Sequence, residues 1–247
     1  SRLQNYLYAN GSTLTLGPGQ TIQGSDSLLG NNAGMINQGT IIASQNGSAM
    51  SIDPDSRGFV NIGTLKATGT GGLNLSPANY TNTSNTIEIG DGSRIRLYTG
   101  TNIIDGTILA TPGGSGFIDM QGNPQFTNVT FEAPLPVPNN TAAYFEGDMT
   151  NNTVISLNSI GNNTMLILDY ADPVIKGSGE IVMGNRAQNL ILAPNRVLTL
   201  ADGHTISGAG NILANNFQIV AIGEDHSLAN YMMRVYGTIR SPLDIMN

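Results

Sequence analysis

The sequence has no cysteine and no tryptophan, and only 11% of its 247 residues are Asp, Glu, Lys or Arg. Without cysteine the chain forms no disulfide and uses no thiolate chemistry. Soluble domains carry about 25% charged residues, and helical bundles and coiled coils depend on Lys, Glu and Leu repeats. This composition therefore excludes both helical classes. No stretch reaches the roughly 18 consecutive apolar residues of a membrane-spanning helix, so we expect no membrane span.

Basic residues are scarce as well. Ten Lys and Arg stand against 17 Asp and Glu, which gives a net charge of −7 and a sequence pI of about 4.6. Binding to nucleic acid requires clustered basic side chains that neutralise phosphates. We therefore expect no nucleic-acid partner.

What the chain has instead is glycine (31 residues), proline (11), and many Asn and Thr between short apolar runs. Gly, Asn, Asp and Pro separate these runs and supply tight corners with positive φ. No window shows the 3.6-residue periodicity of an amphipathic helix. The runs are typical of short strands, for example residues 13–16, 86–89, 94–98, 102–104, 107–110, 165–168 and 180–183.

An internal repeat is the most informative feature. Residues 2–32 align without a gap on residues 186–216, at an offset of 184, and fourteen of the thirty-one positions are identical. After an insertion in the second copy, Gly39-Thr40-Ile41 is echoed by Gly237-Thr238-Ile239. We therefore predict a module of residues 1–185 and, continuous with it, the start of a second copy over residues 186–247.

The repeat is too long for one coil of a solenoid, so each module should hold several coils. We predict an all-β fold, a right-handed parallel β-helix (β-solenoid) of roughly ten rungs. Ile, Leu, Val and Met should stack inward, and outward Asn and Thr should form ladders along the axis. Tandem β-sandwiches are the competing architecture, but their modules repeat near about 100 residues.

Two segments depart from this pattern. Residues 131–149 contain Pro134, Pro136 and Pro138 at alternate positions, which favours an extended edge or a rung with a loop excursion. Residues 224–233 lie inside the insertion of the second copy, and we expect a surface loop or a terminal cap there.

Several phrases resemble the repeats of large secreted bacterial proteins of the filamentous-haemagglutinin and autotransporter kind. They include Leu14-Thr15-Leu16-Gly17-Pro18-Gly19-Gln20-Thr21-Ile22 and Met35-Ile36-Asn37-Gln38-Gly39-Thr40-Ile41-Ile42-Ala43. The resemblance implies a pectin-lyase-like β-helix, export from the cell, and adhesive or structural work at the bacterial surface. It transfers no catalytic residue.

Enzymes built on β-helices need clustered carboxylates or a basic side chain in a groove. The best candidates are Asp169, Asp172 and Lys176, beside Tyr170. Their spacing is loose, and Asp before Pro after a strand is the usual mark of a turn. We therefore interpret these residues as structural.

Metal sites are equally poorly supported. The sequence from Asp53 through Asp55 to Arg57 suggests a calcium loop but lacks the further ligands and the fixed glycine, so a turn with a local Asp–Arg pair is the better interpretation. His204 and His226 are the only histidines, and Gln20 replaces His204 in the first copy, which argues against catalysis. We predict no catalytic, cofactor-binding or metal-binding residue.

Aromatic side chains that stack on sugars are the remaining possibility. Five tyrosines are candidates for exposed positions: Tyr6, Tyr8, Tyr80, Tyr98 and Tyr144. Without tryptophan and without regular spacing they make no carbohydrate platform.

The sequence thus favours an extracellular structural or adhesive β-solenoid that is not an enzyme and associates head to tail into a filament or surface layer. The likeness of residues 2–32 to residues 186–216 supports stacking of chain ends, since uncapped solenoid ends expose strand edges. The expected partners are other copies of the chain and, as a further possibility, surface polysaccharide. The alternative is a β-helix that binds or cleaves polysaccharide, which would collect acidic and aromatic residues in one groove.

Overall fold

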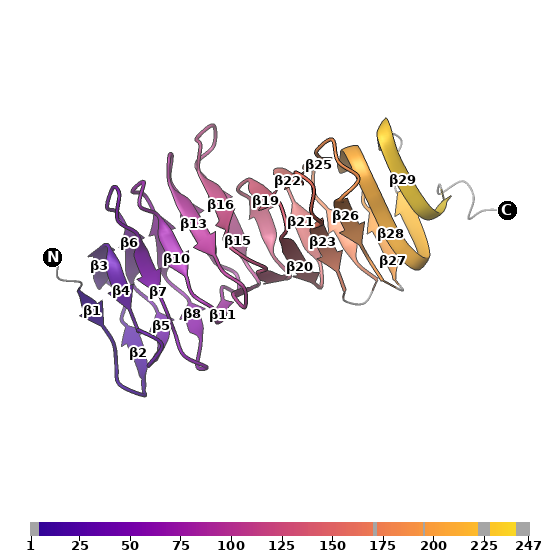
Figure 1. Ribbon diagram of the computed structural model, residues 1–247. Coiled ribbons are helices and arrows are strands. Elements are labelled where there is room, and N and C mark those ends of the chain that lie inside the picture. Colours follow the sequence, from indigo (N-terminus) through magenta and orange to yellow (C-terminus); the bar gives the residue numbers. More distant parts are fainter. Residues whose placement is uncertain (1–4, 170–171, 195, 222–227, 241–247) are drawn as a thin grey trace. The chain divides into compact units, whose positions relative to one another are not determined.

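A computed structural model describes residues 5–169, 172–194, 196–221 and 228–240 (Figure 1). All regular secondary structure in these ranges is β-strand, and none of it is helix. The chain forms two compact units, Ser1–Pro124 and Gln125–Asn247. Within the described residues no helix is long and apolar enough to cross a membrane.

The described residues of unit 1 form sixteen short strands, which Gly- and Asn-rich corners separate. They are β1 (Tyr6–Leu7), β2 (Thr13–Leu16), β3 (Thr21–Gly24), β4 (Asp26–Leu28), β5 (Gly34–Asn37), β6 (Thr40–Ala43), β7 (Met50–Ile52), β8 (Phe59–Asn61), β9 (Thr64–Ala67), β10 (Leu73–Leu75), β11 (Asn79–Thr81), β12 (Thr86–Ile89), β13 (Arg94–Leu97), β14 (Asn102–Ile104), β15 (Thr107–Ala110) and β16 (Phe117–Met120).

Within unit 1 each strand from β1 to β13 pairs in parallel with the strand three positions later in the chain. This pairing is the mark of a solenoid with three strands in each turn. One sheet runs β1-β4-β7-β10-β13-β16. A second series is β2, β5, β8, β11 and β14. A third is β3, β6, β9, β12 and β15. The predicted parallel β-solenoid is confirmed.

In unit 2 the described residues repeat this construction over thirteen strands. They are β17 (Gln125–Thr127), β18 (Thr130–Glu132), β19 (Leu135–Pro138), β20 (Ala142–Glu146), β21 (Met149–Asn151), β22 (Val154–Asn158), β23 (Thr164–Leu168), β24 (Val174–Lys176), β25 (Glu180–Met183), β26 (Asn189–Leu192), β27 (Val197–Leu200), β28 (Thr205–Ala221) and β29 (Leu228–Arg240). Their pairing is again parallel and again skips two strands, as in β20–β23–β26 and β21–β24–β27. The two units together make about nine turns, close to the predicted ten.

Alternate residues of each strand point into the solenoid. In β6, Ile41 is fully buried while its neighbour Ile42 is half-buried on the outer side. Ile41 stacks in register on Leu65, Leu65 on Ile87, and Ile87 on Ile108. The core is therefore a set of aliphatic rows along the axis, as the short alternating runs predict.

A row of asparagines is buried inside unit 1, where we expected such ladders only on the outer surface. The Asn37 Nδ2 amide donates to Asn61 Oδ1 at 2.8 Å, and Asn61 Nδ2 donates to Asn82 Oδ1 at 2.8 Å. Asn82 Nδ2 then donates to the Asn85 carbonyl oxygen at 2.8 Å. All three side chains in the row are at most 2% exposed. Each amide supplies both a donor and an acceptor, so asparagines stacked at a buried corner can hydrogen-bond along the row. Among the described residues, the Asn37 Oδ1 at the start of the row accepts no hydrogen bond.

The proline-rich segment 131–149 is strand almost throughout, so the predicted loop excursion is wrong. It contributes β18 to β21 in close succession. The predicted edge is confirmed, since the described residues pair β19 with β22 alone. A proline has no N–H, and the N–H groups of alternate residues in a strand point to the same side. One side of β19 therefore cannot donate hydrogen bonds to a neighbouring strand, because Pro134, Pro136 and Pro138 stand at alternate positions.

In the second-copy insertion, residues 222–227 lie outside the described residues. The rest of the predicted loop, from Leu228 on, is part of strand β29 and pairs with β28. The surface loop is therefore wrong for residues 228–233, while the terminal cap stays a prediction. The predicted module ends at residue 185, whereas the first compact unit ends at Pro124. The two boundaries differ because the module is defined by repeated sequence and the units are defined by contacts.

Candidate functional site

The Asp169, Asp172 and Lys176 candidates do not form one cluster of mutual contacts. The Asp172 carboxylate accepts a hydrogen bond from the Val197 N–H at 2.9 Å, which ties its turn to the next rung. The Lys176 ammonium pairs instead with Asp148, and both side chains are exposed. Asp169 is exposed, and Tyr170 lies outside the described residues. These contacts support the structural interpretation of Asp172.

The segment Asp53 to Arg57 is a turn with a local ion pair, as predicted. The Asp55 carboxylate pairs with the Arg57 guanidinium and also accepts the Arg57 N–H at 2.9 Å. Within the described part of the chain, no three His, Asp or Glu side chains gather where they could hold a metal ion.

His204 is a buried structural side chain in unit 2. It is 5% exposed, and its Nε2 lies 3.0 Å from the Nδ2 amide of Asn151, two turns earlier. Burial lowers the pKa of His204 to about 4, although the nearby Glu180 charge acts in the opposite direction. The ring is therefore neutral at pH 7 and accepts the Asn151 amide hydrogen. His226 lies outside the described residues.

The five tyrosines differ in exposure. Tyr6, Tyr8 and Tyr144 are exposed, at 57%, 58% and 39%, and Tyr98 is half-buried. Tyr80 was expected at the surface, but it is 1% exposed inside unit 1. The Tyr80 side chain can lie inside because its hydroxyl donates a hydrogen bond to the Ile52 carbonyl oxygen at 2.8 Å. Burial raises the pKa of the Tyr80 hydroxyl.

Other aromatic side chains are also internal. In unit 2, Phe126, Phe131 and Phe145 form a buried cluster with ring centroids 5.0 to 5.8 Å apart. In unit 1, Phe59 lies 5.8 Å from the Tyr80 ring. These rings stabilise the core and are not available to stack on a sugar.

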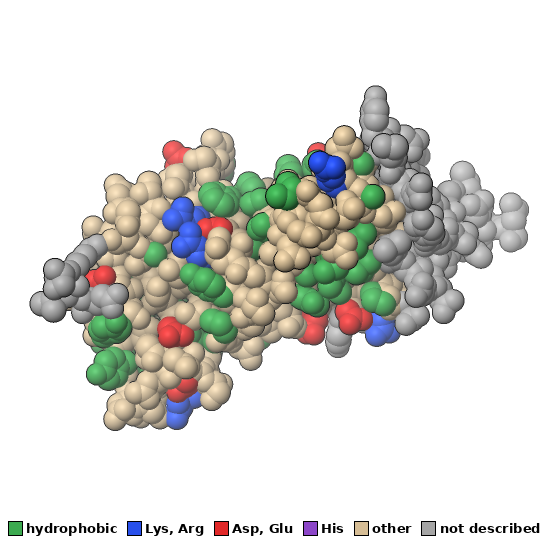
Figure 2. Space-filling model, in the orientation of Figure 1, with side chains coloured by type: hydrophobic (Ala, Val, Ile, Leu, Met, Phe, Trp, Pro, Cys, Tyr) green, Lys and Arg blue, Asp and Glu red, His purple; other side chains and the backbone are tan. Residues whose placement is uncertain are grey.

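The visible surface is mostly neutral and polar, and charged side chains occur in small separate groups (Figure 2). One shallow hollow of about 370 Å³ lies on the outer face of β9, β12 and β15. Lys66 and Glu88 line it as register partners, together with Leu109, Thr111 and other uncharged residues. It contains one carboxylate and no aromatic ring.

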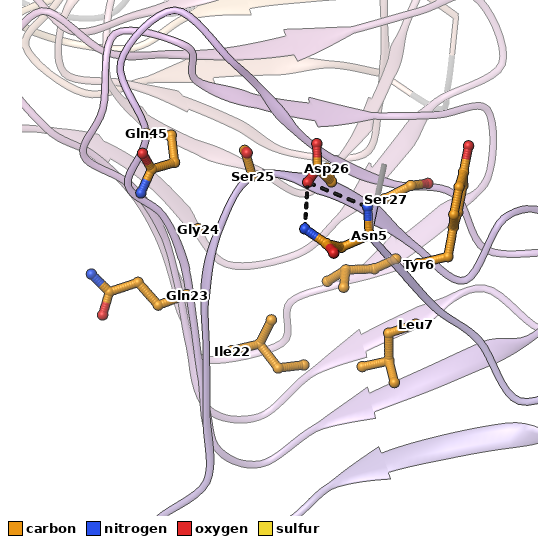
Figure 3. Close-up of a pocket in the computed structure, with 11 residues that line it drawn as sticks. Asn5, Tyr6, Leu7, Ile22, Gln23, Gly24, Ser25, Asp26, Ser27 and Gln45 are labelled. Atoms are coloured by element: carbon orange, nitrogen blue, oxygen red, sulfur yellow. Dashed lines mark hydrogen bonds between the residues drawn. The ribbon is translucent and has the colours of Figure 1, made fainter. Parts of the chain in front are cut away.

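A second hollow, of about 380 Å³, lies at the N-terminal end of unit 1, which we define as strands β1, β2 and β3 (Figure 3). The side chains of Leu7 and Ile22 gather at one side of this hollow, and Asn5 and Asp26 lie at the other. The Asn5 Nδ2 amide donates to Asp26 Oδ2 at 2.9 Å. Apolar and polar groups thus meet at the first turn of the solenoid.

Strand edges make this end distinctive. In the described residues, β1 pairs with β4, β2 with β5, and β3 with β6, each on one side only. Leu7 remains 39% exposed there, although it belongs to a strand of the stack. The sequence signal for this end is Tyr6-Leu7-Tyr8, which stands where the second copy has Leu190-Ile191-Leu192. Taken alone, the sequence suggests only sugar contacts for those tyrosines.

Comparisons of the chain with models of protein families, with curated proteins and with solved structures give no match. The residues and their geometry are therefore the basis for the function proposed below.

Proposed function

We propose that this chain is a structural and adhesive β-solenoid segment that works outside the bacterial cell and associates end to end with other copies. The N-terminal end of unit 1 is the observation that carries the proposal. In the described residues three strands there pair on one side only, beside partly exposed apolar side chains, and strand edges of this kind pair with other chains. The neutral outer surface suits a scaffold better than a catalyst.

Sedimentation velocity across low to high micromolar concentration, with electron microscopy of the same samples, tests the proposal. We expect the sedimentation coefficient to rise with concentration and filaments to be visible. Leu7→Lys places a charge at the N-terminal end and should abolish association. Ile62→Lys is the matched control, because Ile62 is 61% exposed at a corner away from that end. A parent chain that stays monomeric throughout would contradict the proposal.

The second candidate, binding or cleavage of a polysaccharide, would use the hollow at Lys66 and Glu88, although that hollow lacks the several acidic and aromatic residues expected of such a groove. An acid or base in a groove is what such chemistry requires. Glu88→Gln should then abolish cleavage or binding of an acidic polysaccharide while leaving sedimentation unchanged. If the parent chain neither binds nor cleaves a panel of neutral and acidic polysaccharides, this candidate is excluded.

A further inference from the structure

The two copies of the repeat share backbone features over residues 17–24 and 201–208, so the second copy can be used to interpret the first. The Gln20 N–H donates to the Gly17 carbonyl oxygen at 3.2 Å, and at the corresponding place the His204 N–H donates to the Ala201 carbonyl oxygen at 3.4 Å. The glycine inside each turn has a similar positive φ, 76° in the first copy and 81° in the second. The copies therefore present corresponding side chains on corresponding strands, β1 with β26, β2 with β27, and β3 with the start of β28.

Corresponding side chains differ sharply in exposure. Leu7 is 39% exposed, whereas its counterpart Ile191 is fully buried. Tyr6 is 57% exposed against 9% for Leu190. The same holds for the half-buried Leu14 and Ile22, whose counterparts are 0% and 2% exposed. The second copy thus buries a surface that the first copy leaves open.

Inside unit 2, the preceding turn of the solenoid covers that surface. Strands β23, β24 and β25 stack in parallel on β26, β27 and β28, with Leu166 on Ile191 and Ile181 on Ile206. The inward residues of the covering turn, such as Leu166, Ile175 and Ile181, are fully buried aliphatic side chains. What covers the second copy is therefore a strand-paired turn with an aliphatic inner row.

A polar contact locks the covering turn in place. Asn189 is fully buried, and its Oδ1 accepts the Ser159 N–H of the preceding turn at 3.0 Å. Its counterpart Asn5 is exposed and bonds to Asp26. The same residue type is thus present at the N-terminal end of unit 1, beside the hollow of Figure 3.

We infer that the N-terminal end of unit 1 is a docking surface for a further parallel β-solenoid turn of the kind that residues 159–183 form. This inference rests on the proposed end-to-end association and names its receiving surface and the chemistry of its partner. Recognition comes from three strand edges in register, an aliphatic inner row placed over Leu7, Leu14 and Ile22, and a main-chain N–H placed over Asn5. Neither a sugar nor a small apolar ligand offers that combination.

An extended chain tests the inference without any association between molecules. Residues 159–185 are attached directly before Arg2, in place of Ser1, so that Asn185 precedes Arg2 as it naturally precedes Arg186. Amide hydrogen exchange is followed in residues 5–16, whose sequence occurs once in the extended chain. We expect exchange there to slow by about tenfold or more relative to the parent chain, because stable strand pairing protects amides.

The matched control carries Leu166→Asp and Ile181→Asp in the attached copy alone, so its composition and length are nearly unchanged. It should give the parent rate of exchange in residues 5–16. The inference is overturned if the unsubstituted attachment also leaves that rate unchanged, or if both attachments slow it equally.

The amide-exchange experiment on the extended chain and the sedimentation experiment on the parent chain can fail independently of each other. Slower exchange in the extended chain, with a parent chain that sediments as a monomer, supports the docking surface and removes the end-to-end association. Filaments from the parent chain without protection in the extended chain would mean that association uses another surface, and the inference would then be wrong.

Discussion

Ile41 shows what a single inward side chain contributes. It is fully buried in an aliphatic row between turns, and Ile42 beside it faces outward. Ile41→Asp should lower the free energy of unfolding by about 3 to 5 kcal/mol, because it leaves an unpaired charge in the core. Ile42→Asp is the matched control and should change it by less than about 1 kcal/mol. Urea unfolding of both variants measures the difference, and equal effects would place the Ile41 side chain outside the core.

His204 makes stability depend on pH. Its pKa falls from 6.5 to about 4 on folding, so the unfolded chain binds a proton that the folded chain does not bind between these values. Stability from this residue is therefore complete above about pH 6.5 and is lost progressively as the pH falls toward about 4, by roughly 1 to 3 kcal/mol in all.

His204→Gln separates this contribution from that of the carboxylates. Glutamine is the residue at the corresponding position of the first copy, Gln20, and it does not titrate. Urea unfolding at about pH 7 and about pH 4.5 should show a smaller loss of stability in the variant than in the parent. An identical loss in both proteins would mean that the His204 ring titrates normally.

The asparagine row shows how a polar element is stabilised inside a solenoid. Asn61 both accepts from Asn37 and donates to Asn82, so Asn61→Ala leaves a donor and an acceptor without that partner in a buried corner. We expect a loss of roughly 2 to 4 kcal/mol in the free energy of unfolding, since each unsatisfied buried group costs about 1 to 3 kcal/mol. Gln38→Ala, at an exposed neighbouring position, is the control and should be nearly neutral. Thermal unfolding measures both, and a neutral Asn61→Ala would contradict the row as a stabilising element.

The sequence predicted strands and corners well because both are local. Alternating apolar residues between Gly and Asn corners specify short strands, and β2, β12, β14, β15 and β25 begin and end where the pattern places them. The inward direction of Tyr80 and of the asparagine row could not be predicted. It depends on hydrogen-bond acceptors and amides supplied by other turns, which a single stretch of sequence does not contain.

The candidate site was predicted only in part for a similar reason. The repeat indicated that the chain end could mimic a continuing chain. It did not indicate that Leu7 would be open while Ile191 is closed, because exposure depends on which turn stacks on each copy. Pro134, Pro136 and Pro138 are the opposite case, since a missing N–H is a property of the residue itself and predicted the edge at β19.

At the scale of the whole molecule, charge should control assembly. Each protein chain carries a net charge of −7, so end-to-end association of two chains brings like charges together. Raising sodium chloride from about 20 mM to about 200 mM screens this repulsion, and we expect association at lower protein concentration. Sedimentation velocity at both salt concentrations measures the shift. Weaker association in high salt would indicate that attraction between charged groups holds the ends together.

The register of the stack also sets how such a chain can change in evolution. Ile41, Leu65, Ile87 and Ile108 occupy one row although the spacings between them are 24, 22 and 21 residues, so corners differ in length while the row is kept. An insertion of one residue within a strand would turn its inward side chains outward, because side chains alternate with a period of two. Changes of length are therefore tolerated in corners or as whole turns. Duplication of a block of complete turns would lengthen the protein without disturbing any row, and the similarity of residues 2–32 to residues 186–216 is what such a duplication would leave in the sequence.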